Sequence, residues 1–245
     1  MIFPLYRCVA LLTGVLLAID SQAGIVLNTT RVIYPAKDKE VSFGVRNTGN
    51  AEILLQSWLE PSVENLDPGS LPFVVTPALA RVQGDGKQLL RIIYAGADMP
   101  RDRESVLWLN VQEIPQAVAE NSLQVAIRQR IKVFFRPEGL SGEVAQAPQG
   151  LRWRIESAGL QVENPGAYHV SMVRLELRQD GAILLSQDGQ MIAPGQSIQL
   201  PLKYPPKPAP INLDFISIND FGGQEPYRAA LKTGQTVQAE VAEPR

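Results

Sequence analysis

The stretch "LQVAIRQRIKVFFRP", from Leu123 to Pro137, alternates between apolar and polar residues over most of its length. Alternation with a period of two is typical of a β-strand that has one apolar face. Most strands are about 5 to 6 residues long, so the stretch predicts a strand longer than one domain normally needs. Its apolar members share one parity: Leu123, Val125, Ile127, Ile131, Val133 and Phe135.

Two explanations fit the extra length. The strand either bends across two packing environments within one domain or leaves part of its apolar side for a partner. An uncovered apolar edge promotes aggregation, so an exposed part would need a partner. Gln129 interrupts the apolar series, which suggests a first segment, 123–127, for a neighbour and a second, 131–135, for the domain's own core. A plain core strand stays open as the alternative.

The first 23 residues, "MIFPLYRCVALLTGVLLAIDSQA", have the pattern of a secretory signal peptide. Arg7 precedes an apolar run of 12 residues, and small residues at Ser21 and Ala23 mark a cleavage site after Ala23. The run is shorter than the about 20 residues that span a bilayer. We therefore expect a soluble, exported mature chain, which keeps 222 of the 245 residues after these 23 are removed.

Composition limits how the mature chain is stabilised and what it binds. Its one cysteine, Cys8, lies in the signal peptide, so the mature chain has no disulfide. The remaining length suffices for two domains of about 110 residues, each with its own core. The net charge of −2 gives no indication of a nucleic-acid partner or of an anionic membrane surface.

Short apolar runs, separated by turn-forming residues, predict an all-β protein of two sandwiches. Seven runs fall in about 115 residues, which is typical of an immunoglobulin-like domain over residues 24–138. A small, polar, turn-rich connection follows at 139–149, and a second such domain at 150–240. The runs of the first domain are "GIVLNTTRVIY", "EVSFGVRN", "EILLQSWLE", "PFVVTP", "KQLLRIIYA", "VLWLNVQEI" and the long stretch.

Two segments of the second half are expected outside its strands. "PPKPAP", Pro205 to Pro210, has the composition of a solvent-facing loop. The last residues, "VQAEVAEPR", are expected to be a frayed tail.

The sequence offers little for catalysis or for a cofactor. His169 is the only histidine, and its setting "AYHVSM" indicates an ordinary strand. A serine–histidine–aspartate relay would depend on it, and a transition-metal site would lack ligands. Glu163 and Asp220 are expected to be surface or structural carboxylates. A carboxylate-based hydrolase is a weak alternative, and no cofactor is expected.

Four ordered motifs resemble one family, the periplasmic chaperones of the chaperone/usher pathway that assemble pili in Gram-negative bacteria. The most specific is "DRESVLWLNVQEIP", Asp102 to Pro115; the family usually continues with a proline or small residue where this chain has Gln116. "TRVIY", "RIKVFFRP" and "INDFGG" are similar to its other landmarks. The short segment "QAVAENS" before the donor strand resembles the branch that serves rod-like or adhesin-tipped pili.

The resemblance implies two immunoglobulin-like domains at an angle, in an L or boomerang shape, with a cleft between them. It implies a non-enzymatic, periplasmic chaperone whose partners are pilin subunits and the outer-membrane usher. In that family the chaperone lends a strand to a subunit that lacks one, a form of strand addition. The open strand edge makes self-association of the free chaperone plausible. An exported tandem immunoglobulin-like structural or adhesive module is the alternative.

The family's site residues carry over to matching positions. Arg31 and Lys132 match the two cleft residues that bind the carboxylate at a subunit's C-terminus. A carboxylate accepts well from both side chains, and such an anchor would fix the register of the added strand. Leu123, Val125 and Ile127 match the alternating donor residues. Glu104, Arg136 and Asp220 match a set of charges that bridges the two domains.

Overall fold

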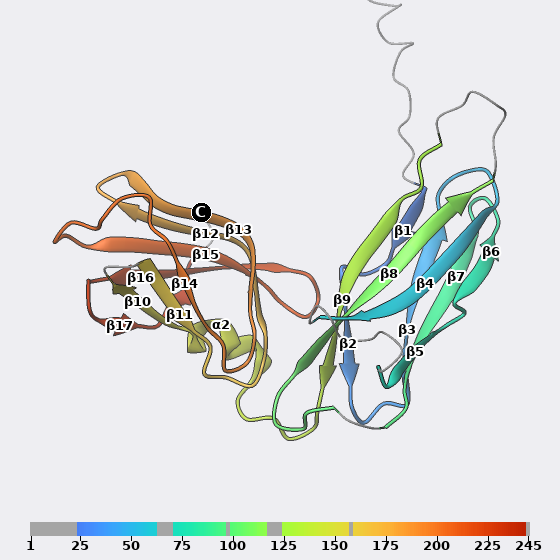
Figure 1. The fold of residues 1–245 in the computed structure, drawn as a ribbon, viewed down its shortest axis with the longest axis horizontal. Helices are drawn as coiled ribbons and strands as arrows, with labels where there is room; N and C mark the ends of the chain where they lie inside the picture. The colour runs from blue at the N-terminus through green and yellow to red at the C-terminus, as the bar shows by residue number, and fades with distance from the viewer. Residues whose placement is uncertain (1–23, 63–70, 97–98, 117–123, 157–158, 244–245) are drawn as a thin grey trace, which may run out of the picture.

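The computed structural model describes residues 24–243 except 63–70, 97–98, 117–123 and 157–158. The expected signal peptide at 1–23 and the donor residue Leu123 lie outside the described residues. Two β-sandwiches stand beside each other with their strands at an angle (Figure 1), so the expected fold class is confirmed. The sandwiches have separate hydrophobic cores with no residue in common.

The N-terminal domain consists of two facing sheets. Within the described residues one sheet has the strand order β1-β3-β7-β5 and the other the order β2-β9-β8-β4-β6. Neighbouring strands are antiparallel except β2 and β9, which are parallel. The strands are β1 Ile25–Leu27, β2 Arg31–Pro35, β3 Glu40–Asn47, β4 Ile53–Pro61, β5 Phe73–Thr76, β6 Leu79–Val82, β7 Lys87–Tyr94, β8 Ser105–Pro115 and β9 Arg128–Arg136.

The first apolar run of the mature chain, expected as one strand, is divided between the two sheets. β1 pairs with β3, and after a break at 28–30 β2 pairs with β9. The break is held by side chains: Asn28 Oδ1 accepts the Gly44 N–H at 3.0 Å, and the Thr29 hydroxyl donates to the Arg31 carbonyl. Switching sheets places Arg31 next to β9.

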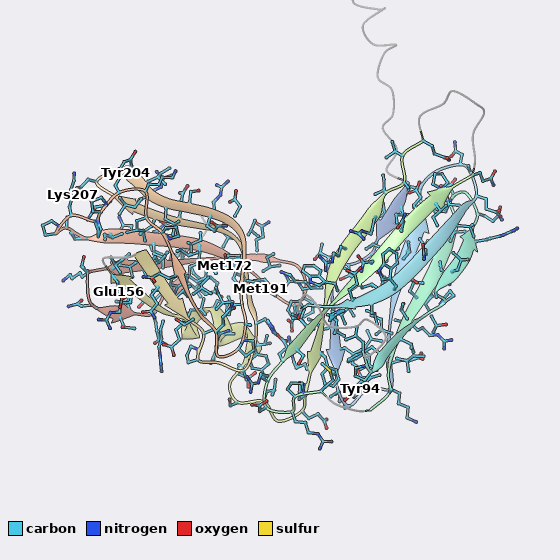
Figure 2. The ribbon with its side chains drawn as sticks, in the orientation of Figure 1. Tyr94, Glu156, Met172, Met191, Tyr204 and Lys207 are labelled. Atoms are coloured by element: carbon cyan, nitrogen blue, oxygen red, sulfur yellow. The ribbon has the colours of Figure 1, made fainter. Side chains whose placement is uncertain are left out.

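Aromatic rings fill the part of this core next to the end of β9. Tyr94, low in the N-terminal domain in Figure 2, stacks on Phe73 with ring centres 4.8 Å apart and lies 4.7 Å from Phe135. Tyr34 completes the cluster, and its hydroxyl donates to the Lys39 carbonyl at 2.8 Å. Phe135, near the end of β9, is thus fixed by the core of its own domain.

The C-terminal domain repeats the two-sheet plan around Trp153, Phe215 and Tyr227. Its described sheets have the orders β14-β11-β10-β17 and β13-β12-β15-β16-β18. A 3-10 turn, η2 Val144–Gln146, and a short helix, α2 Ala147–Gly150, precede it. The strands are β10 Arg152–Glu156, β11 Gly159–Glu163, β12 Val170–Gln179, β13 Ala182–Ile192, β14 Ser197–Leu200, β15 Ile211–Ile218, β16 Gln224–Leu231, β17 Thr236–Val237 and β18 Glu240–Val241.

The expectation of a frayed tail from Val237 onward is wrong for the described residues up to 243. β17 pairs with β10, and β18 pairs with β16. Ala239, between them, is buried in the core. The segment is short and polar in sequence, and it is ordered because it covers the sheet edges.

In the part that the structure describes, the long alternating stretch is a strand only from Arg128 to Arg136. Val133 and Phe135 are buried in the domain core, and Ile131 packs against it. The described residues 124–127 precede the strand, and one backbone bond, from the Glu113 N–H to the Ile127 carbonyl at 2.9 Å, continues the pairing. The stretch therefore has a core part and an exposed part.

Candidate functional site

The two domains meet around a cavity of about 160 Å³. Arg31 and Phe134, from β2 and β9, contribute one wall, and the turn between β15 and β16 contributes another. This turn reaches across to the N-terminal domain (Figure 1). Next to it, the Arg31 guanidinium donates a hydrogen bond to the carbonyl of Ile218, the last residue of β15, at 3.0 Å. The remaining lining residues include Glu104, Arg136, His169, Asn219, Asp220 and Phe221.

Arg31 is a buried cation that is only partly satisfied. It begins β2, and its guanidinium carbon lies 5.5 Å from the centre of the Phe134 ring. Its Nε is buried without a hydrogen-bond partner in the described residues. Burial lowers the pKa of Arg31, and the more distant charges of Asp220 and Glu104 oppose this only in part.

Lys132 lies directly beside Arg31. The two residues are partners in the parallel register of β2 and β9, so their side chains leave the same face of the sheet. The ammonium lies 5.6 Å from the centre of the Trp108 ring. Burial lowers the pKa of Lys132, and the neighbouring charge of Arg31 lowers it further.

Within the described part of the chain, neither of these two cations forms an ion pair with a carboxylate. Two adjacent, partly desolvated positive charges repel each other and have donors to spare. An anion placed between them would relieve the repulsion and accept those hydrogen bonds. The structure thus brings the sequence-predicted pair together, with hydrogen-bond donors that an anion could accept from.

The three predicted bridging charges also meet, and all three line the cavity. Arg136, which ends β9, donates to Glu104 Oε1 at 2.8 and 3.0 Å and to the Asp220 carboxylate at 2.6 and 2.9 Å. Burial alone would lower the pKa of Arg136, but the hydrogen bonds to Asp220 and the charge of Glu104 outweigh burial and raise it. Asp220 lies in the C-terminal domain, so this ion pair crosses the domain boundary.

His169 is a fourth member of this cluster, and its setting in the sequence did not indicate this contact. It does not lie in a strand but just before β12, where its ring is buried. Its backbone N–H donates to Glu104 Oε2 at 2.9 Å, and its Nδ1 lies 3.0 Å from the same oxygen. Its one sequence signal was that it is the only histidine, which does not indicate a contact with another domain.

The described donor residues are exposed. Val125 has 65% of its surface accessible and Ile127 has 39%. β2 pairs with β9 only from Lys132 to Arg136, so residues 124–131 have no strand beside them on that edge within the described chain. Gln129, which breaks the apolar series, turns toward β1 and donates to the Ile25 carbonyl at 2.8 Å. An open backbone edge with outward apolar side chains leads up to the two cations.

Two arginine side chains on the polar face of the long stretch lie over tryptophan rings. Arg130 lies 4.3 Å from the centre of the Trp108 ring and forms an ion pair with Glu60 at 3.2 Å. Arg128 lies 5.9 Å from the Trp58 ring. Such cation–π contacts hold long side chains in place. They order the sheet face next to Lys132.

In the described residues, no group of histidine, cysteine, aspartate or glutamate side chains could hold a metal ion. None of the described helices is long and apolar enough to cross a membrane.

Two family models match the chain. Residues 24–141 match "Pili and flagellar-assembly chaperone, PapD N-terminal domain", and residues 146–229 match "Pili assembly chaperone PapD, C-terminal domain". The chain is 39% identical over 218 residues to the probable fimbrial chaperone YadV of Escherichia coli, which covers 83% of this chain and 88% of YadV.

Solved structures give the same result. The Pseudomonas aeruginosa CupB2 chaperone superposes with a TM-score of 0.72 at 35% identity, covering 84% of this chain and 100% of that one. The SafB chaperone of Salmonella enterica, solved in complex with the SafA pilin, has a TM-score of 0.72 at 27% identity, covering 87% and 99%. The chain therefore belongs to the family of pili assembly chaperones, which are folding and assembly helpers rather than enzymes.

Proposed function

We propose that this protein is a periplasmic chaperone that captures pilin subunits by lending them a strand. The signal peptide is cut after Ala23, and the mature chain binds a subunit in the periplasm and delivers it to the outer-membrane usher. The SafB structure, with its bound pilin, supports a pilin as the class of partner. The description of the related SfaE protein as a periplasmic chaperone supports the compartment.

The observation that carries the proposal is the arrangement of charge beside an open edge. Arg31 and Lys132 offer a carboxylate two adjacent cations, neither of which is paired in the described chain. The edge at 124–131 offers unpaired backbone groups to an added strand. The carboxylate at a subunit's C-terminus would bind at the cations and set the register in which the subunit pairs with this edge.

Apolar burial would supply the rest of the affinity. Val125 and Ile127 point into solvent, and each would contribute about 1.5 to 3 kcal/mol on full burial, before the ordering costs of association. Leu123 shares their parity and is proposed as a third donor residue. A salt-linked hinge of Glu104, Arg136 and Asp220 would hold the domains so that the cleft stays formed.

The test compares a subunit that ends in a carboxylate with the same subunit ending in a carboxamide. The wild-type chaperone should bind the carboxylate form more tightly by about 2 to 5 kcal/mol, the usual cost of leaving one partner of a buried charge pair alone. Lys132→Met should abolish this preference. The probe is a purified pilin subunit that the wild-type chaperone binds, and calorimetry gives the affinities.

Lys87→Met provides the matched control, because Lys87 is an exposed lysine on β7 in the opposite sheet. It should retain the preference for the carboxylate form. If Lys132→Met retained the preference as well, the carboxylate anchor would be wrong even if the protein still bound pilins.

A further inference from the structure

A buried carboxylate lies far along β8 from the domain boundary. Glu113 faces the core side of the sheet, opposite Leu55 on β4, and only 8% of its surface is exposed. Its Oε2 is buried and has no hydrogen-bond partner in the described chain, and burial raises the pKa of Glu113. An unpartnered buried carboxylate is costly, so a missing partner is to be expected.

Gly24 lies against this carboxylate. A side chain at Gly24 would overlap both carboxylate oxygens of Glu113. The Cβ position at Gly24 is about 2.5 Å from the residue's own nitrogen, so that nitrogen lies within about 5 Å of the carboxylate. Only a glycine leaves room for the carboxylate to stay where it is.

Gly24 is held firmly at this place. Its carbonyl accepts the Thr48 N–H at 2.9 Å. The next residue, Ile25, is buried in the core, and its carbonyl accepts the Gln129 amide at 2.8 Å. The distance between the Gly24 nitrogen and Glu113 is therefore set by the sandwich and not by a loose end.

We propose that removal of the signal peptide creates the missing partner, an α-ammonium group at Gly24 that pairs with Glu113. The inference rests on the proposed cleavage after Ala23. Water hydrolyses the peptide bond: the hydroxyl goes to the Ala23 carbonyl carbon, and the Gly24 nitrogen becomes an amine. An α-amino group has a pKa of about 7.7 to 8.0, so at neutral pH it takes a proton and becomes a cation. Before cleavage the same nitrogen is an uncharged amide.

The pair would act at the base of the donor segment. The Glu113 backbone N–H donates to the Ile127 carbonyl at 2.9 Å, so Glu113 links the mature N-terminus to residue 127. In the mature chain the ion pair would hold Glu113 in place, and with it the hydrogen bond to Ile127. The uncleaved precursor lacks it and is the less stable form of the N-terminal domain.

A four-chain cycle tests the pairing in the full mature protein. One chain begins at Gly24, released from a fusion by a protease that leaves no extra residue; the second begins at Ala23, so that its ammonium is displaced. Each is made with Glu113 and with Glu113→Gln. Retaining Ala23 should raise the unfolding constant about 10- to 100-fold in the Glu113 chains and should leave it nearly unchanged in the Glu113→Gln chains.

Glu138→Gln, a change at an exposed carboxylate beyond β9, is the matched control and should keep the full effect of Ala23. If Glu113→Gln does not fold, acetylation of the Gly24 amine in the wild-type chain should produce the same loss of stability without an added residue. An equal effect of Ala23 in both backgrounds, or no effect of acetylation, would overturn the pairing.

Mass spectrometry of the exported protein tests the cleavage separately. A terminus other than Gly24 would overturn the cleavage site and the inference that rests on it.

Discussion

Lys132 is a residue at which binding and stability oppose each other. Its ammonium is partly desolvated and lies beside Arg31, and in the described chain it has no carboxylate partner. Lys132→Met keeps most of the side-chain volume and removes one of the two repelling charges. We expect it to raise the free energy of unfolding of the free protein by about 0.5 to 2 kcal/mol, the range of single stabilising substitutions, as measured by urea denaturation at pH 7.

The pH dependence gives this prediction a sign. The pKa of Lys132 is lower in the folded state than its ordinary value of 10.5, so protonation favours the unfolded chain. The penalty is complete below the folded-state pKa and disappears as the pH rises to the ordinary value. The stability advantage of Lys132→Met should therefore shrink as the pH is raised toward 10.5. An advantage that stayed constant to that pH would mean that the charge is not its cause.

Single residues were predictable only where a motif carried them. Alternation placed Lys132 on the polar parity, but only the family resemblance matched it with Arg31, a residue 101 positions earlier in the chain. Glu104, Arg136 and Asp220 were found in the same way. No motif assigned a role to His169 or to Glu113. Their importance depends on the burial and on the partners that folding gives them.

Among the elements, β9 and the residues before it have opposite environments. Ile127 and Val133 share one parity, yet Ile127 is exposed and Val133 is fully buried. Ile127→Asp should change the free energy of unfolding by less than about 0.5 kcal/mol, as is usual for surface positions. It should abolish pilin capture, because a charge would be buried where the proposed strand donation buries an apolar side chain.

Ala126→Asp is the matched control for this substitution. Ala126 is also exposed but lies on the opposite parity, so the same charge would project from the other face of the sheet than Ile127 does. It should retain capture in a periplasmic co-purification assay. A large fall in the melting temperature of Ile127→Asp would instead favour the plain core strand.

Elements were predictable where alternation was strong and not where the chain turned corners. The core part of β9 and the signature strand β8 followed from period and motif. The break between β1 and β2 did not, because it depends on Asn28 accepting a hydrogen bond from a strand that comes later. The order of the tail did not follow either, since a polar segment gains order only from the edges it covers.

The same arrangement of asparagine hydrogen bonds occurs in both domains, although their sequences show no repeat. Asn47 and Asn164 each accept the N–H of the glycine two residues later and donate to distant carbonyls. Asn47 connects the end of β3 to the last residue of β6 and to the residue after it, and Asn164 connects the chain after β11 to the end of β13. The two sandwiches thus share a way of closing their loops although their sequences do not align.

On the scale of the whole molecule, two separate cores are joined by hydrogen bonds and ion pairs around Arg136. The domains share no core residue. The described hydrogen bonds between them centre on Arg136, Glu104 and His169, with Arg31 and Asp220 beside them. We therefore expect their relative orientation to depend on these charged groups, while each fold depends on its own apolar core.

Asp220→Asn tests this division, since it keeps the shape of the side chain and removes the charge that Arg136 binds across the boundary. Losing hydrogen bonds to a charged group costs about 1.5 to 3 kcal/mol, and here the loss should fall on the contact between the domains. The His169 amide, which donates to Glu104 from the other domain, should exchange its hydrogen about 10- to 100-fold faster. The core amides of Leu109 and Leu213 should keep their wild-type exchange rates, because their cores do not contain the cluster.

Asp214→Asn is the matched control, because it removes an ion pair with Arg228 inside one domain. It should leave the exchange rate of the His169 amide unchanged. Faster exchange of the core amides in Asp220→Asn would show that the charge cluster stabilises the domains themselves and not the joint between them.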